Sequence, residues 1–200
     1  MPRRLPTALL AAACALGTAG ASALAASSAP PKPAADAIWA TVDLCNTPAH
    51  PDTIGIRGAM PGTGQRAATM FMSFAVEYRD AHGVWHALTA AGTSGFVAVG
   101  NAASRSRQAG RDFTIATKTA HTYLLRGVVG FEWRLGGRVI NAAVRSTTAG
   151  HHASAGADPA GYSASVCSMA LKRRGSLVIT PVTPSAARRA SSDALLTVHT

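Results

Sequence analysis

Carboxylates are scarce in this chain of 200 residues, which has 9 Asp and Glu against 19 Lys and Arg and a net charge of +10. A glycosidase needs two carboxyl groups that face each other across a cleft, and no spacing in the sequence pairs them. We expect Glu132 to meet a neighbouring arginine instead. The central part of the chain holds seven acidic residues, namely Asp43, Asp52, Glu77, Asp80, Asp112, Glu132 and Asp158.

The sequence also lacks the usual metal-binding spacings. It contains neither Cys-x-x-Cys nor His-Glu-x-x-His, and a metal site needs several donors that converge. His82 and His86 flank Trp85, and His151 is followed directly by His152. We interpret these histidines as solvent-exposed, so the sequence predicts no metal and no cofactor.

A catalytic nucleophile is not evident either. Residues 92–95 read Gly-Thr-Ser-Gly, one residue away from the Gly-Asp-Ser-Gly around the serine of chymotrypsin-like proteases. The histidine context of that family, Thr-Ala-Ala-His, fails here because residues 89–91 are followed by glycine. A triad also needs a base and a carboxylate around the serine, and too little chain precedes Ser94 to build the first barrel. We interpret 92–95 as a turn that enters a strand and assign no catalytic residue.

No apolar run reaches the roughly 20 residues that a membrane helix needs. Arg3 and Arg4 precede the apolar segment 5–16, and residues 23–25 read Ala-Leu-Ala, which is typical of a signal peptide. Acylation at Cys14 and a twin-arginine signal are alternatives that fit less well. We therefore expect residues 1–25 to be a signal peptide and the mature chain to be secreted, without a transmembrane segment.

Only three cysteines are present, and Cys14 would leave with the signal peptide. Cys45 and Cys167 remain, and a cysteine pair in an oxidising compartment is expected to be bonded. The sequence thus predicts one disulfide, Cys45–Cys167.

Helical periodicity is absent, and apolar residues instead recur at every second position from Ile38 onward, which is typical of strands. We expect an all-β fold, a single antiparallel β-sandwich over residues 38–170. A linker rich in Ala and Pro (26–37) precedes it, and a basic, largely disordered tail (171–200) follows it. Residues 100–111 and 147–159 are expected to be loops. The expected strands are 38–45, 54–60, 70–78, 84–88, 95–99, 113–117, 123–134, 139–146 and 162–169, with 177–179 as a potential edge strand.

The excess of basic residues suggests contact with a polyanion. The folded unit 38–170 has 11 basic and 7 acidic residues, whereas 171–200 has 5 basic and 1 acidic. An anionic cell-envelope polymer or another extracellular protein is the expected partner, and no physiological nucleic acid is expected. The tryptophans Trp39, Trp85 and Trp133 are a potential glycan-stacking platform, although we expect at least one in the core. The candidate polyanion contacts are Arg105, Arg107 and Arg111 in the expected loop and Lys172, Arg173 and Arg174 in the tail.

Three segments resemble a group of secreted actinobacterial proteins of unassigned function. They are Trp39-x-x-Val42-Asp43-x-Cys45, Gly55-Ile56-Arg57-Gly58-x-Met60-Pro61-Gly62 and Tyr123-x-x-Arg126-Gly127-x-Val129-x-Phe131-x-Trp133-Arg134. More distantly, the last of these resembles the late strands of immunoglobulin-like adhesion modules. The resemblance implies an immunoglobulin-like sandwich, but the antibody-type bridge links two interior strands, whereas Cys45 and Cys167 lie on the first and last expected strands. It implies no catalytic residues.

Together these patterns favour a non-enzymatic extracellular module that acts in binding or in association with the cell envelope. A small secreted hydrolase with an unrecognised site and a purely structural secreted domain are the alternatives.

Overall fold

The computed structural model describes residues 37–88, 94–103, 105–117, 120–172 and 179–181. This part of the chain contains ten strands and no α-helix. The expected signal peptide, almost all of the expected linker and most of the expected tail lie outside the described residues.

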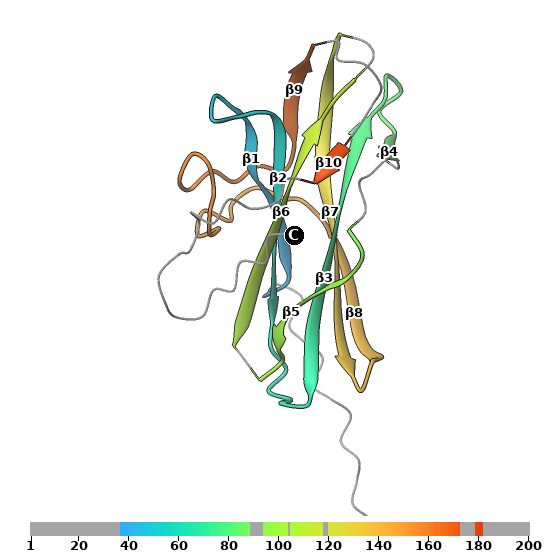
Figure 1. Cartoon of the computed structure of the whole chain (residues 1–200), viewed down its shortest axis with the longest axis vertical. Helices are drawn as coiled ribbons and strands as arrows, with labels where there is room; N and C mark the ends of the chain where they lie inside the picture. The colour runs from blue at the N-terminus through green and yellow to red at the C-terminus, as the bar shows by residue number, and fades with distance from the viewer. Residues whose placement is uncertain (1–36, 89–93, 104, 118–119, 173–178, 182–200) are drawn as a thin grey trace, which may run out of the picture.

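The strands form two antiparallel sheets (Figure 1). The four-stranded sheet has the order β1 (Trp39–Thr47), β2 (His50–Pro61), β6 (Ser106–Ile115), β10 (Ile179–Pro181). The six-stranded sheet has the order β4 (Trp85–Ala87), β3 (Ala68–Arg79), β7 (His121–Leu135), β8 (Arg138–Ser146). Within it, β5 (Val97–Asn101) also pairs with β3, and β9 (Cys167–Leu171) also pairs with β7. The expected all-β antiparallel fold is confirmed.

The core lies between the two sheets and consists of alternate residues of the long strands. In β3 the buried and half-buried positions alternate strictly, as the period of two predicts. A close approach of the sheets is possible at Gly127 because a Cβ there would lie only 2.6–2.8 Å from side-chain carbons of Ile56. The largest side chains of this core include Met70, Met72 and Phe74 of β3, Phe131 and Trp133 of β7, Ile54 and Ile56 of β2, and Phe113 of β6.

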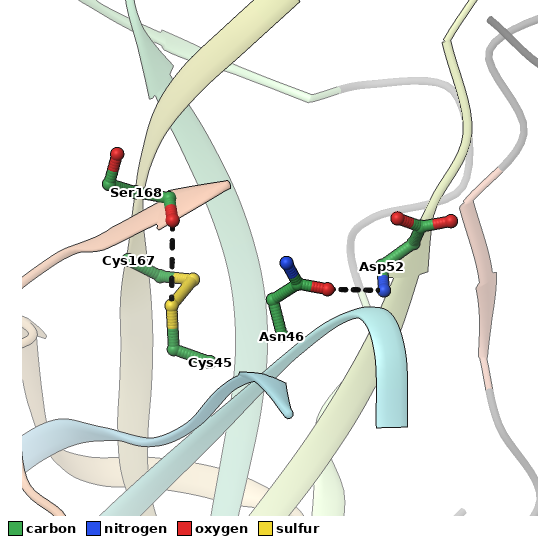
Figure 2. The surroundings of a disulfide bond; sticks show 5 residues. All are labelled: Cys45, Asn46, Asp52, Cys167 and Ser168. Carbon is green, nitrogen blue, oxygen red and sulfur yellow. Dashed lines mark hydrogen bonds between the residues drawn. A yellow bond between two sulfur atoms is a disulfide. The ribbon is translucent and has the colours of Figure 1, made fainter. Parts of the chain in front are cut away.

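The disulfide joins the two sheets. Cys45 lies on β1, an edge strand of the four-stranded sheet, and Cys167 lies on β9 of the six-stranded sheet (Figure 2). The sulfur atoms are 2.01 Å apart and the Cα atoms 5.5 Å apart, so the predicted pairing is confirmed. Beside it, the side chain of Asn46 accepts a hydrogen bond from the backbone N–H of Asp52 and holds the turn between β1 and β2.

Two of the expected boundaries are wrong. Residues 100–111 are not one loop, because β6 already begins at Ser106 and pairs with β2 from Pro61↔Ser106 to Thr53↔Thr114. The polar composition of 106–111 hid this strand, whose formation depends on backbone pairing with a distant segment. The closing strand is also shorter than 162–169, because only Cys167–Leu171 pairs with β7 and Ala164 instead bridges to Val42.

Candidate functional site

The outer face of the four-stranded sheet is covered by the segment 147–166. This segment follows the edge of β1, where Thr148 donates its N–H to the carbonyl of Ala40, and Val42 and Ala164 exchange two backbone hydrogen bonds. It also reaches the third strand, because the side chain of Gln108 hydrogen-bonds the backbone of Ala153 and Ala155.

An ion pair is buried on this covered face. Arg57 Nε donates to Asp43 Oδ2 at 2.8 Å, and the two side chains are 1% and 2% exposed. Burial raises the pKa of the Asp43 carboxyl, Arg57 opposes this effect, and Asp112 adds to it. Since both partners are enclosed, we assign the pair to the structure of the sandwich rather than to a ligand site.

The outer face of the six-stranded sheet is different, since the described residues leave its side chains half-buried or exposed along its length. It is built from alternate positions of β3 and β7, the strands that lie side by side in Figure 1. The exposed apolar side chains on it include Val144 of β8, at 64%, and Phe96, at 38%. We call this surface the open face. It comprises Phe71, Ser73, Ala75, Glu77 and Arg79 of β3, Leu124, Arg126, Val128, Gly130, Glu132 and Arg134 of β7, together with Trp85, Phe96 and Val144.

One end of the open face carries a guanidinium held between a ring and a carboxylate. The Cζ atom of Arg126 lies 4.3 Å from the centre of the Trp85 ring. The Nε and Nη2 atoms of Arg126 lie 2.7 and 2.6 Å from Glu77 Oε2. A cation over an indole face and a charge-assisted hydrogen bond both favour this arrangement, so the three side chains are positioned together.

The other end repeats the arrangement with phenylalanine rings. Arg134 Cζ lies 4.3 Å from the ring centre of Phe71 and 5.2 Å from that of Phe96. The Nε and Nη2 atoms of Arg134 lie 2.7 and 2.6 Å from Glu132 Oε2. The expected arginine partner of Glu132 is thereby confirmed as Arg134.

The two clusters are separated by a stretch of the sheet with mostly small side chains. Arg126 and Arg134 are eight residues apart on one strand, which corresponds to about 26 Å at the usual rise of a β-strand. Small side chains occupy the area between them, and the Phe96 ring packs above Gly130, 3.2 Å from where a Cβ of that residue would lie. The open face is thus a long surface with a polar aromatic cluster at each end and the Phe96 ring over part of its middle.

The Trp85 end of the open face continues into an open hollow of about 500 Å³. It lies between the β3–β4 turn and the start of β7 and is lined by Arg79, Asp80, Ala81, His82, Gly83, His121, Thr122 and Leu124. Asp80 organises the turn, because its carboxylate accepts hydrogen bonds from the backbone N–H groups of His82 and Val84 and lies 2.7 Å from His86 Nε2. The His86 imidazole and these N–H groups lower the pKa of Asp80.

The candidate polyanion contacts do not form a single exposed loop. Arg105 and Lys172 are exposed, whereas Arg107 and Arg111 are half-buried within β6. Burial lowers the pKa of the Arg111 guanidinium. Arg173 and Arg174 lie outside the described residues.

The three tryptophans do not share a surface, and the expectation that at least one lies in the core is confirmed. Trp133 is fully buried in the core and donates its Nε1–H to the carbonyl of Pro61. Trp39 stacks on His151 with the ring centres 4.5 Å apart. Only Trp85 belongs to the open face.

The serine and histidine candidates have structural partners. The Ser94 hydroxyl accepts a hydrogen bond from the backbone N–H of Phe74 at 2.8 Å. His151 Nε2 lies 3.0 Å from the Thr148 hydroxyl, and burial lowers the pKa of this imidazole. His152 Nδ1 meets the carbonyl of Gly161 at 2.8 Å. Within the described ranges, no three His, Cys, Asp or Glu residues converge as a metal site would require, and no helix could cross a bilayer.

The residues of the open face were largely missed by reasoning from sequence. The sequence names Arg126 and Arg134 in a long strand, Glu77 among the scarce acids and Trp85 as a potential stacking residue, but nothing in it brings them together. Phe71 and Phe96 were not singled out. The available signal was the alternation of β7, which places Arg126, Glu132 and Arg134 on the side opposite to the apolar positions.

Comparisons with protein-family models, with curated proteins and with solved structures found no match to this chain.

Proposed function

We propose that this chain is a secreted, non-enzymatic binding module that associates with the bacterial cell envelope through the open face. The observation that carries the proposal is the pair of arginine–glutamate–aromatic clusters on a sheet face that nearby residues leave exposed. Solvent-exposed aromatic and arginine side chains are the residue types enriched in binding surfaces.

Two further observations support the proposal. The Cys45–Cys167 disulfide is typical of proteins that work in oxidising compartments, in line with the signal-peptide features of residues 1–25. The opposite outer face is covered by 147–166, so the part of the chain that the structure describes offers one broad sheet surface rather than two.

The test is co-sedimentation of the mature protein with purified bacterial cell envelope. Val144→Glu places a charge on the most exposed apolar side chain of the open face, where it faces solvent in the free protein. Burial of an unpaired charge is costly, so we expect this variant to lose about tenfold or more in apparent affinity, which corresponds to about 1.4 kcal/mol.

The matched control is Ala49→Glu, which adds the same charge in the exposed turn between β1 and β2. It should bind as the wild type does, and both variants should show the wild-type circular dichroism spectrum and thermal midpoint. Unchanged binding of Val144→Glu would refute the proposal.

A second comparison separates the open face from simple charge attraction. Arg105→Ala and the triple variant Lys172→Gln, Arg173→Gln, Arg174→Gln remove the candidate polyanion contacts other than Arg107 and Arg111, which are half-buried in β6. If these variants lose binding, and wild-type binding collapses as salt is raised above physiological strength, attachment is electrostatic and the open face is not the binding surface.

A further inference from the structure

The open face and the hollow together carry three arginines and three carboxylates, although the whole chain is strongly basic with a net charge of +10. The arginines are Arg79, Arg126 and Arg134, and the acids are Glu77, Asp80 and Glu132. Each of Arg126 and Arg134 is already neutralised by a glutamate. An anionic polymer laid on this surface would meet three carboxylates, two arginines whose charge glutamates already compensate, and Arg79. The surface therefore offers no net attraction to a polyanion, and this balance of charge favours a neutral ligand.

The clusters offer hydrogen-bond donors and acceptors side by side. A guanidinium has five N–H donors in a fixed plane. In Arg126 and Arg134 the glutamates contact the nitrogens Nε and Nη2. The carboxylates supply acceptors in the same place. A ligand that matches such a surface needs many groups that both donate and accept, as hydroxyl groups do.

The rings and the small residues add flat apolar surface between these polar groups. Trp85 lies at one end and Phe71 at the other, and the Phe96 ring reaches from the Arg134 cluster over Gly130. Ser73 and Ala75 are small residues between the two clusters. Pockets that hold small organic ligands combine apolar and aromatic surface with a few placed polar groups. A chain of sugar rings has this character, with apolar C–H faces and hydroxyl edges.

The shape of the surface fits an extended chain. The clusters are about 26 Å apart along the strand direction, which spans several sugar rings. Beyond Trp85, the hollow of about 500 Å³ has the size of a small-molecule site. Arg79, His82, His121 and Thr122 line it with both donors and acceptors, so it can receive one end of the chain or a branch.

We infer that the ligand of the open face is a neutral, linear polysaccharide that lies along β3 and β7 and enters the hollow beside Trp85. This inference rests on the proposed binding role of the open face and names the class of ligand. It replaces the anionic polymer expected from the overall charge.

The experiment is competition against envelope co-sedimentation. Polysaccharide released from the same envelope is separated by anion exchange into a neutral and an acidic fraction, and each is added to the full mature chain. The neutral fraction should displace the wild-type protein, and raising the salt to about 0.5 M should change binding by less than about twofold, because no net charge is neutralised.

Fluorescence locates the ligand independently of sedimentation. Saturation with the neutral fraction should change the tryptophan emission of the wild type, since Trp85 would leave water. The change should disappear in Trp85→Phe, which retains a ring for stacking, and should persist in the matched control Trp39→Phe, whose ring stacks on His151 away from the open face.

Three results would overturn the inference. Competition by the acidic fraction alone would assign an anionic ligand. Loss of binding after protease treatment of the envelope, without competition by either fraction, would assign a protein partner. In both cases the loss of binding in Val144→Glu would still support the proposed function. If Val144→Glu binds like the wild type, the proposed function and this inference fail together.

Discussion

Arg57 Nε and Asp43 Oδ2 lie 2.8 Å apart in an ion pair that is almost fully removed from solvent. Within the described residues, the Nη1 atom of Arg57 and the Oδ1 atom of Asp43 are buried without a hydrogen-bond partner. The guanidinium lies over Gly110 of the neighbouring strand, where a Cβ would come within 2.8 Å of Arg57 Cζ. The pair therefore depends on two strands beside it and on the segment 147–166 above it.

Removal of one partner of this pair should be strongly destabilising. In Arg57→Met the Asp43 carboxylate stays buried without its cation, which typically costs about 3–5 kcal/mol. Denaturant unfolding measures this loss, and the double variant Arg57→Met, Asp43→Leu should recover a large part of it. The control Arg66→Met removes an exposed arginine and should change the unfolding free energy by less than about 0.5 kcal/mol. Wild-type stability of Arg57→Met would show that the pair contributes little.

The same pair predicts a pH dependence of stability. Burial, with Asp112 adding to it, raises the pKa of Asp43 above 3.8 despite the opposing effect of Arg57. The folded state thus holds this proton more tightly than the unfolded state, and the contribution of Asp43 to the unfolding free energy decreases as the pH rises from about 3.8 through the folded pKa.

The measurement compares wild type with Asp43→Asn in urea at several pH values. Asp80 acts in the opposite direction, because its pKa is lowered and its contribution is lost as the pH falls below 3.8. Only the difference between the two proteins isolates Asp43. A difference that does not vary with pH would contradict the assignment.

Gly127 should not tolerate a side chain. An added Cβ would lie 2.6–2.8 Å from Ile56 carbons on the opposite sheet, and overpacking of this kind typically costs about 1–3 kcal/mol. The double variant Gly127→Ala, Ile56→Ala should cost less than the two single changes together, which a double-mutant cycle measures. Gly95→Ala, which meets nothing within 4 Å, is the control and should be nearly neutral.

The disulfide should contribute substantially to stability, because it joins residues 122 positions apart. Loss of a native disulfide from a small secreted domain typically costs about 2–5 kcal/mol. We expect Cys45→Ala, Cys167→Ala to have a clearly lower thermal midpoint than the wild type, and a reducing agent to lower the wild type to the same value. A midpoint that is insensitive to reduction would contradict this expectation.

The alternation of apolar residues predicted the strands with one buried face. Residues 70–78 were expected as a strand and lie within β3, whose even positions face the core. This pattern can be recognised within one strand, because successive side chains point to opposite faces of the sheet and only one of these faces is buried. The same logic failed for β6, because Arg107 and Arg111 lie opposite the core residues Met60 and Ile56. Polar residues therefore occupy both sides of this strand, and its sequence does not alternate in polarity.

The candidate site could not be assembled from sequence. Trp85, Glu77 and Arg126 come from three strands, and only the pairings Arg79↔Trp85 and Glu77↔Arg126 place them together. The basic residues chosen from composition were a poor guide. Arg107 and Arg111 lie opposite the core residues Met60 and Ile56 on the inner side of β6, whereas Arg126 and Arg134 lie on the outer side of β7.

The sequence by itself determined the class of fold, the pairing of Cys45 with Cys167 and the outward position of alternate residues. The fold class and the outward positions depend on local periodicity, and the pairing depends on the small number of cysteines. Only the tertiary structure decided which sheet face the described residues leave exposed, that Arg57 is enclosed, and that the charges of the open face and the hollow balance. These properties depend on where a loop from residues 147–166 lies and on which strands are neighbours, and such contacts between distant residues leave no periodic trace in the chain.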